Sequence, residues 1–149
     1  MRLRFGIDLG GTKTEIVALD EQDRVLLRRR RSTPDGYAAI IEAIAGLLSE
    51  AETALSERGT VGIGIPGSVS PVTGRVRNAN TRALNGADLP GDLRAALGRD
   101  VRIMNDANCL AMSEAADGAG RGFGVVFAVI LLVTRGRFPA WLAQGSRAA

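Results

Sequence analysis

The chain has 149 residues, of which 46% are hydrophobic and 23% charged, a composition that predicts one soluble globular domain able to bury its own core. Its single cysteine and the absence of histidine exclude an internal disulfide and an ordinary zinc site, so any general base must be a carboxylate, tyrosine or lysine. The formal net charge of +3 is uneven: residues 1–117 hold 15 basic and 16 acidic side chains, whereas residues 118–149 hold four arginines and no acid.

The start of the chain leads directly into a strand-like segment, and no apolar run is long enough to span a bilayer. We therefore expect a cytoplasmic protein without a membrane partner. Because the basic excess is confined to the C-terminal segment, we expect no nucleic-acid partner either. The arginines at 28–31 leave two interpretations open: a solvated edge strand, which we favour, or a functional basic patch.

The first third of the chain predicts an antiparallel meander followed by a helix. The expected strands and turns are Arg4–Leu9, a Gly10-Gly11 turn, Lys13–Leu19, an acidic turn at Asp20–Asp23, and Arg24–Arg31. Apolar residues then recur at spacings of three, four and seven from Tyr37 to Leu55. This stripe predicts an amphipathic helix that Asp35 would cap.

The rest of the chain alternates between short strands and helices. The expected elements are a strand at Val61–Ile65, a hairpin around Thr73-Gly74, a helix at Asp88–Leu97, a strand at Val101–Met104, a helix at Asn105–Ala116, and a strand at Val125–Val133. This order predicts an α/β fold with a mixed sheet. Its early strands would form antiparallel hairpins, its later strands would be parallel, and helices would lie on both faces.

The glycine turn is the first candidate site. Gly10 and Gly11 have no Cβ, so backbone N–H groups can face one concavity and phosphate oxygens can approach them closely. Asp8 precedes the turn and is placed to hold a magnesium-bound water, while Thr12 and Lys13, the only lysine of the chain, add donors and positive charge. We predict a phosphate-binding turn, with a purely structural turn as the alternative; the spacing is not that of a P-loop.

A second candidate is Asn105-Asp106, which opens a predicted helix directly after a strand. Asn105 can cap the helix, and the helix dipole favours an ionised carboxylate at Asp106. At the carboxyl end of a strand this carboxylate would face a ligand crevice, where it could take the proton of a substrate hydroxyl. The alternative is that both residues only cap the helix. Three more asparagines, at positions 78, 80 and 85, suit sugar hydroxyls but are more often turn residues.

Together, these segments resemble the ROK family of bacterial sugar kinases and related repressors, most closely its fructokinase or mannokinase branch. The matching stretches lie, in order, within Phe5–Glu15, Gly62–Ser68, Asn78–Gly86 and Asn105–Ala119. The resemblance implies an actin-like ATPase fold (ribonuclease H-like) of two lobes, with ATP and sugar meeting in the cleft between them. For the full-length family it leaves a homodimer open.

The resemblance also implies a reaction, the transfer of the γ-phosphoryl group of ATP to a hexose hydroxyl, with the 6-hydroxyl as the expected acceptor. Asp106 would be the catalytic base. The sugar-binding residues would be Gly67, Asn80, Asn105 and Asp106. The first phosphate motif would consist of Asp8, Gly10, Gly11, Thr12 and Lys13, and Asp8 would hold Mg²⁺ through a water molecule.

The family pattern stops after Ile130. There the family would continue with Leu-Gly-Thr-Gly, but this chain reads Leu-Leu-Val-Thr-Arg-Gly-Arg-Phe-Pro over 131–139. The family's Glu-x-Gly-His sugar segment, its zinc-binding cysteines and its adenosine-binding lobe have no counterpart in the sequence. We therefore interpret residues 1–130 as the N-terminal lobe, with the second lobe missing, and residues 131–149 as an aberrant tail, out of frame or disordered.

On this interpretation the chain is a truncated hexose kinase with background activity. Two alternatives stay open. One is a fragment of a ROK-type transcriptional regulator, although the residues ahead of the glycine turn are too few for a helix-turn-helix. The other is a non-catalytic ATP-binding module, whose exposed apolar face would favour self-association.

Overall fold

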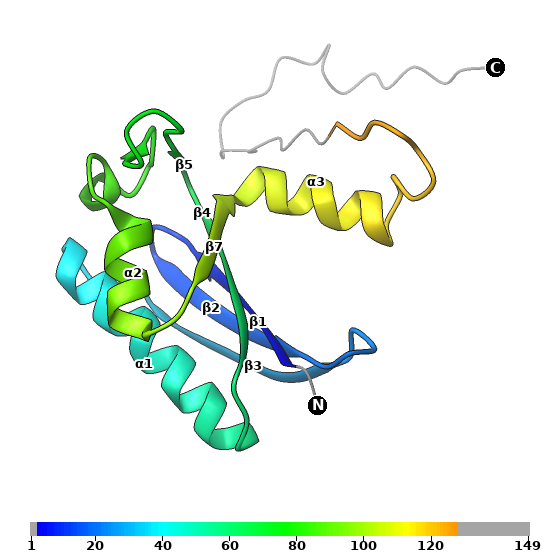
Figure 1. Ribbon diagram of the computed structural model, residues 1–149, viewed down its shortest axis with the longest axis horizontal. Helices are drawn as coiled ribbons and strands as arrows, with labels where there is room; N and C mark the ends of the chain where they lie inside the picture. Colours follow the sequence, from blue (N-terminus) through cyan, green and yellow to red (C-terminus); the bar gives the residue numbers. More distant parts are fainter. Residues whose placement is uncertain (1–2, 128–149) are drawn as a thin grey trace, which may run out of the picture.

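The computed structural model describes residues 3–127, and the order of its elements follows the order expected from the sequence (Figure 1). The strands are β1 (Leu3–Leu9), β2 (Lys13–Leu19), β3 (Val25–Ser32), β4 (Gly59–Ile65), β5 (Ser68–Val69), β6 (Val76–Arg77) and β7 (Val101–Asn105). The helices are α1 (Tyr37–Leu55), α2 (Leu89–Leu97) and α3 (Asp106–Ala116), with a 3-10 turn at Arg82–Leu84.

Five of the strands form one mixed sheet, in the order β3-β2-β1-β4-β7. The β1–β2 and β2–β3 pairs are antiparallel, whereas β1–β4 and β4–β7 are parallel. Short β5 and β6 pair separately as a hairpin. The predicted mixed sheet is therefore confirmed, and its parallel half brings the carboxyl ends of β1, β4 and β7 to one edge.

The core lies on the face of the sheet that α1 and α2 cover (Figure 1). Alternate residues of β1 point into it, and the apolar stripe of α1 closes over them. The buried side chains of these elements are Leu3, Phe5, Ile7 and Leu9 from β1; Ile40, Ile44, Leu47, Leu48 and Ala51 from α1; and Leu89, Leu93 and Leu97 from α2. The predicted stripe is thus core, whereas α3 starts on the opposite face and has no buried residue in the described structure.

The predicted cap of α1 is wrong. Asp35 makes no capping hydrogen bond, and the N-cap position belongs to Gly36, whose φ of 89° turns the chain into the helix. A backbone conformation that glycine adopts without strain therefore starts this helix in place of a side-chain acceptor.

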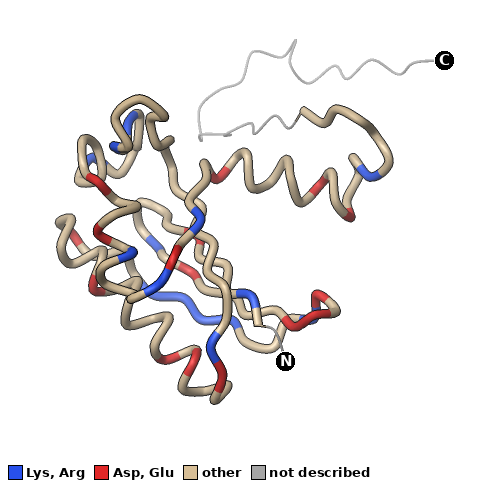
Figure 2. The backbone as a smooth tube through the Cα atoms, in the orientation of Figure 1, with Lys and Arg blue, Asp and Glu red and all other residues tan. Residues whose placement is uncertain are grey.

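The arginines at 28–31 lie on β3, which is an edge strand, as the favoured interpretation required. Successive side chains point to opposite faces of the sheet. Arg28 and Arg30 pair with Glu15 at 3.5 and 2.5 Å, and the other two pair with Glu50 of α1 at 3.4 and 2.5 Å. The basic stretch in Figure 2 is therefore an edge strand balanced by two acidic side chains.

The strand expected at Val125–Val133 is not seen in its described part, because residues 125–127 have no regular structure. Residues 128–133 lie outside the described residues. The interpretation of residues 131–149 as an aberrant tail also concerns residues outside the described range. Over residues 3–127, none of the helices combines the length and the apolar character that a bilayer crossing requires.

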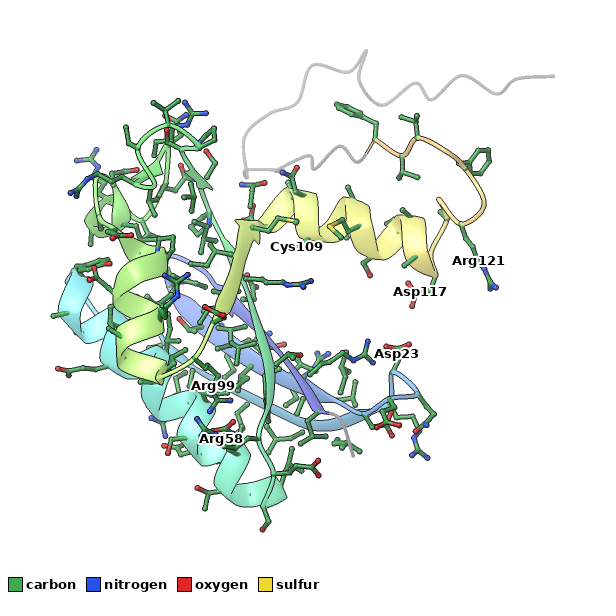
Figure 3. The ribbon with its side chains drawn as sticks, in the orientation of Figure 1. Asp23, Arg58, Arg99, Cys109, Asp117 and Arg121 are labelled. Carbon is green, nitrogen blue, oxygen red and sulfur yellow. The ribbon has the colours of Figure 1, made fainter. Side chains whose placement is uncertain are left out.

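Arg99 fastens α1 to the segment before β7 (Figure 3). Its guanidinium donates to both carboxylate oxygens of Glu52, at 2.6 and 2.9 Å, and to the carbonyl of Gly59 at 3.0 Å. Both charged side chains are mostly buried, 17% and 15% exposed. Arg99→Ala should therefore lower the free energy of unfolding in urea by about 2–3 kcal/mol, because it leaves a buried carboxylate without its main partner.

The matched control is Arg94→Ala, which removes an exposed ion pair with Asp100. Such pairs contribute about 0–1 kcal/mol, so this variant should unfold close to the wild-type denaturant concentration. Equal losses from the two variants would contradict the structural role assigned to Arg99.

Candidate active site

The parallel strands bring three loops to one edge of the sheet (Figure 1). β1 runs into the glycine turn, which we define as residues 10–13, and β4 runs into Pro66-Gly67. β7 runs into Asn105-Asp106. These are the segments that the sequence marked as candidate ligand sites, and carboxyl edges of parallel strands are where α/β proteins bind ligands.

Asn105 joins two of these loops. Its side-chain amide donates to the carbonyl of Gly67 at 2.9 Å, and its amide oxygen accepts from the N–H groups of Ala107 and Asn108 at 3.1 and 3.3 Å. The predicted helix cap is confirmed. Because the same amide also bonds to Gly67, the start of α3 is fixed against the loop that follows β4.

Gly67 in turn contacts the asparagine loop, residues 78–85. A Cβ at Gly67 would lie 2.8 Å from the Cβ of Ala79, so only glycine allows this approach. The side chain of Asn85 clasps Ala79, accepting from its N–H and donating to its carbonyl, both at 2.9 Å. Asn78 adopts a left-handed φ of 56°, which identifies it as a turn residue. Two of the three asparagines therefore shape the loop, while the side chain of Asn80 is exposed at its surface.

The glycine turn is tight, and hydrogen bonds from Thr33 hold two of its carbonyl groups. Gly10 donates to the carbonyl of Lys13 at 2.9 Å, and a Cβ at Gly10 would lie only 2.7 Å from that oxygen. The Thr33 hydroxyl donates to the Gly10 carbonyl at 2.8 Å, and the Thr33 N–H donates to that of Thr12 at 2.9 Å. Within residues 3–127, the N–H groups of Gly11 and Thr12 have no acceptor. Two backbone donors and the exposed Lys13 ammonium are therefore available to an anion.

An open hollow of about 680 Å³ lies on the face of the sheet opposite α1. Gly6, Gly62 and Gly64 form part of its floor, so these three strand positions present no side chain to it. Asp8 and Asp106 both line it, as does Cys109, which Figure 3 labels on α3. The structure therefore places the predicted base and the predicted magnesium ligand around one space.

Burial, and then the charges around Asp8, disfavour its ionised form. Burial raises the pKa of the Asp8 carboxyl, and the negative charges of Asp106 and Glu15 raise it further, while Arg30 partly offsets them. Glu15 lies directly across the β1–β2 ladder from Asp8. A cation or additional hydrogen-bond donors in the hollow would relieve this repulsion.

These residues fit a loosely held magnesium ion. No group of three or more acidic, cysteine or histidine side chains converges as a metal cage in the described part of the chain. Mg²⁺ usually keeps several waters and is held by one or two carboxylates together with substrate phosphates. Asp8, beside a turn with free anion donors, is suited to that kind of binding.

The structure brings some predicted site residues together and leaves others at the rim. Asp8 and Asp106 share the hollow, and Gly67 and Asn105 are in direct contact. The glycine turn and Asn80 lie outside the lining of the hollow.

The sequence interpretation missed three groups near the carboxylates: Glu15, Arg30 and Cys109. Glu15 could have been found from strand alternation, because it shares the open face with Val17 and opposes Asp8. Cys109 is an exposed residue, but its thiol lies over Gly64 and is partly shielded from solvent. This partial burial raises the pKa of the thiol, and the charges of Asp106 and Asp8 raise it further, so little reactive thiolate is present at neutral pH.

Comparison with known proteins places this arrangement in context. The family model described as "ROK family" matches residues 4–136. An N-acetyl-D-glucosamine kinase from Citrobacter koseri is 41% identical over 128 residues, which cover 85% of this chain and 42% of that relative. The chain therefore spans less than half the length of this curated relative.

Solved structures of ROK family proteins resemble this chain as well. The ROK family glucokinase from Streptomyces griseus, crystallised with glucose and AMPPNP, has a TM-score of 0.71 and 30% identity, covering 80% of this chain and 38% of its own. A ROK family transcriptional regulator, a homologue of an Escherichia coli protein, has a TM-score of 0.66 at 17% identity, over 80% of this chain and 32% of its own. The regulator therefore shows the fold alone.

Asp8→Asn should raise the free energy of unfolding at neutral pH, because it removes a carboxylate whose ionised form the fold disfavours. The gain should disappear below the ordinary aspartate pKa of about 3.9, where Asp8 is protonated in both the folded and the unfolded chain. As the pH rises through the folded-state pKa, the wild type should lose stability relative to the variant. Melting temperatures of both proteins between about pH 3 and pH 7 measure the effect.

Asp20→Asn is a control that should change the free energy of unfolding at neutral pH in the opposite direction. Burial by itself raises the pKa of Asp20, but hydrogen bonds from Arg24 and Gln22 bring it below its usual range. Ionised Asp20 therefore stabilises the fold above its unfolded-state pKa, and this variant should be less stable at neutral pH, with a loss that shrinks as the pH falls through the folded-state pKa. A destabilised Asp8→Asn at neutral pH would refute the repulsion described for the hollow.

Proposed function

The chain belongs to the ROK family, and from this premise we propose that it carries the sugar-binding residues, the catalytic base and the first phosphate turn of an ATP-dependent hexose kinase. One observation carries the proposal: Asp106, at the N-terminus of α3, lines the same hollow as Asp8 and follows the Asn105 clamp on Gly67. The proposed base and the proposed cation ligand thus line one space, and Asn105 links the base to the loop that follows β4. The 41% identity to a sugar kinase, against 17% to the regulator, favours an enzyme over a regulator.

In the proposed reaction, Gly67, Asn80 and Asn105 hold the hexose so that one hydroxyl faces Asp106. One oxygen of the Asp106 carboxylate accepts from the Ala107 N–H at 2.7 Å, which orients the group. The other oxygen takes the proton of the hydroxyl as the sugar oxygen bonds to the γ-phosphorus of ATP and the bond to the β-phosphate oxygen breaks. The products are a hexose phosphate and ADP, with the proton on Asp106.

The glycine turn and Asp8 would bind the nucleotide phosphates. The N–H groups of Gly11 and Thr12, the Thr12 hydroxyl and the Lys13 ammonium would donate to phosphate oxygens. Asp8 would hold Mg²⁺ through a water molecule; when bound, this ion neutralises charge on the phosphates. None of these residues would bind adenosine, in keeping with the 42% of the relative's length that the chain covers.

The identity of the sugar and the extent of the lobe are part of the proposal. The sequence resemblance predicts fructose or mannose, and the relatives described above add N-acetylglucosamine and glucose to the sugars to compare. Residues 1–130 as an N-terminal lobe, a cytoplasmic location and a homodimer of the full-length protein stay predictions.

We expect the 149-residue chain to bind one of these four hexoses, with amide chemical shifts changing at Gly67, Asn80 and Asn105 in NMR titrations. Asp106→Asn should weaken binding about 10- to 100-fold, because a hydrogen bond to a charged acceptor is replaced by a neutral one. The matched control is Asp117→Asn, at the far end of the same helix (Figure 3), which should bind as the wild type does. If no hexose binds, or both variants bind equally, the sugar-binding role is refuted.

Turnover is a separate measurement. We expect this chain alone to phosphorylate sugar at the background rate, because positioning and proton transfer both require the substrates to be clamped from two sides. A coupled assay for ADP with each hexose measures this. Turnover that Asp106→Asn abolishes would support the kinase assignment and refute the expectation that this chain alone has only background activity.

A further inference from the structure

Thr81 lies between the two parts of the site that the proposed function treats separately, the glycine turn and the asparagine loop. It follows Asn80 in the loop, and its carbonyl accepts from the Leu84 N–H at 3.0 Å, which starts the 3-10 turn. In space it faces the glycine turn, because a Cβ built on Gly11 would lie 3.5 Å from the Thr81 hydroxyl oxygen. One side chain thus belongs to the loop and faces the turn.

The hydroxyl of Thr81 is shielded from solvent and has no hydrogen-bond partner among residues 3–127. The residue occupies the N-cap position of the 3-10 turn, but its side chain makes no capping bond. Buried hydroxyls are nearly always paired, because an unpaired one has lost its bonds to water without replacement. Packing against the protein alone does not explain why the Thr81 hydroxyl is shielded from solvent without a partner.

Gly11, which Thr81 faces, is unexplained as well. Gly10 must be glycine because of the Lys13 carbonyl, but Gly11 has no such requirement. Its φ is outside the left-handed region, and a Cβ would meet only Thr81, at an ordinary contact distance. Glycine at this position fits a backbone that changes conformation, or is approached closely, when a ligand binds.

We propose that Thr81 is a positioning residue that couples the two ligand sites. When phosphate oxygens bind the N–H groups of Gly11 and Thr12, the turn shifts so that a backbone carbonyl of Gly10 or Gly11 accepts the Thr81 hydroxyl hydrogen. This bond fixes the asparagine loop, so that phosphate binding raises hexose affinity and, by linkage, hexose binding raises phosphate affinity by the same factor. The inference rests on the proposed function, because it requires both ligands.

The test compares Thr81→Val, which keeps the shape but removes the hydroxyl, with Thr81→Ser, which keeps the hydroxyl. Mg²⁺·AMPPNP is titrated into the 149-residue chain by NMR, with and without a saturating amount of the hexose that binds most tightly. In the wild type and in Thr81→Ser, the hexose should tighten nucleotide binding about 2- to 12-fold, the range that one hydrogen bond supplies. In Thr81→Val this factor should fall to about one.

The melting temperature without ligands separates this role from a structural one. Thr81→Val should melt at or above the wild-type temperature, because the hydroxyl it removes has no partner. A lower melting temperature, or coupling in Thr81→Val equal to that of the wild type, would overturn the inference while leaving the proposed function intact. A wild type that binds neither ligand would overturn both.

Discussion

The parallel pairing of β1, β4 and β7 is the constraint on which the rest of the site depends. Ile7 is paired with Ile63, and Ile63 with Ile103, so the three strands run side by side in one register. Their carboxyl ends must then meet at one edge, and three loops that are far apart in sequence become neighbours. Asn105 completes this arrangement by bonding to Gly67 across the edge. A shift in register of one strand would separate the base from the loop that is proposed to hold its substrate.

The two faces of the sheet have different roles, packing on one and the ligand hollow on the other. Successive residues of each strand point to opposite faces, so the sequence alternation determines which residues lie on which face. On one face the odd-numbered apolar residues of β1 pack under α1 and α2. On the other face Gly6, Gly62 and Gly64 leave the backbone bare, and the charged side chains Asp8 and Glu15 stand beside them. The stability of the fold is therefore supplied by one face, while the opposite face carries an electrostatic strain that favours a positively charged ligand.

Much of the fold could be predicted from the sequence, because its helices and strands depend on patterns of residues that are close together in the chain. The α1 stripe, the alternation of β2 and the Asn105 cap each depend on residues close together in the chain. The start of α1 could not be read in this way, since it depends on the backbone conformation of Gly36 and not on the acceptor side chain of Asp35. Nor could the hollow, because its floor is made of glycines from separate strands whose pairing the sequence does not state.

The resemblance to a family went further than these patterns and is confirmed by the match over residues 4–136. The resemblance predicted that Asp106 and the glycine turn belong to one site, whereas no local sequence pattern relates these two segments. Pairwise relations such as Glu15 facing Asp8, or Thr81 facing Gly11, became visible only in three dimensions.

The position of Cys109 has a practical consequence. It is the single cysteine of the chain, it is exposed, and it lines the hollow beside Gly64. A fluorophore or spin label attached to it would report on that hollow from a native residue, with no engineered attachment point and no second thiol to block. Because its thiol pKa is raised, labelling is best done in mildly alkaline buffer, where more thiolate is present.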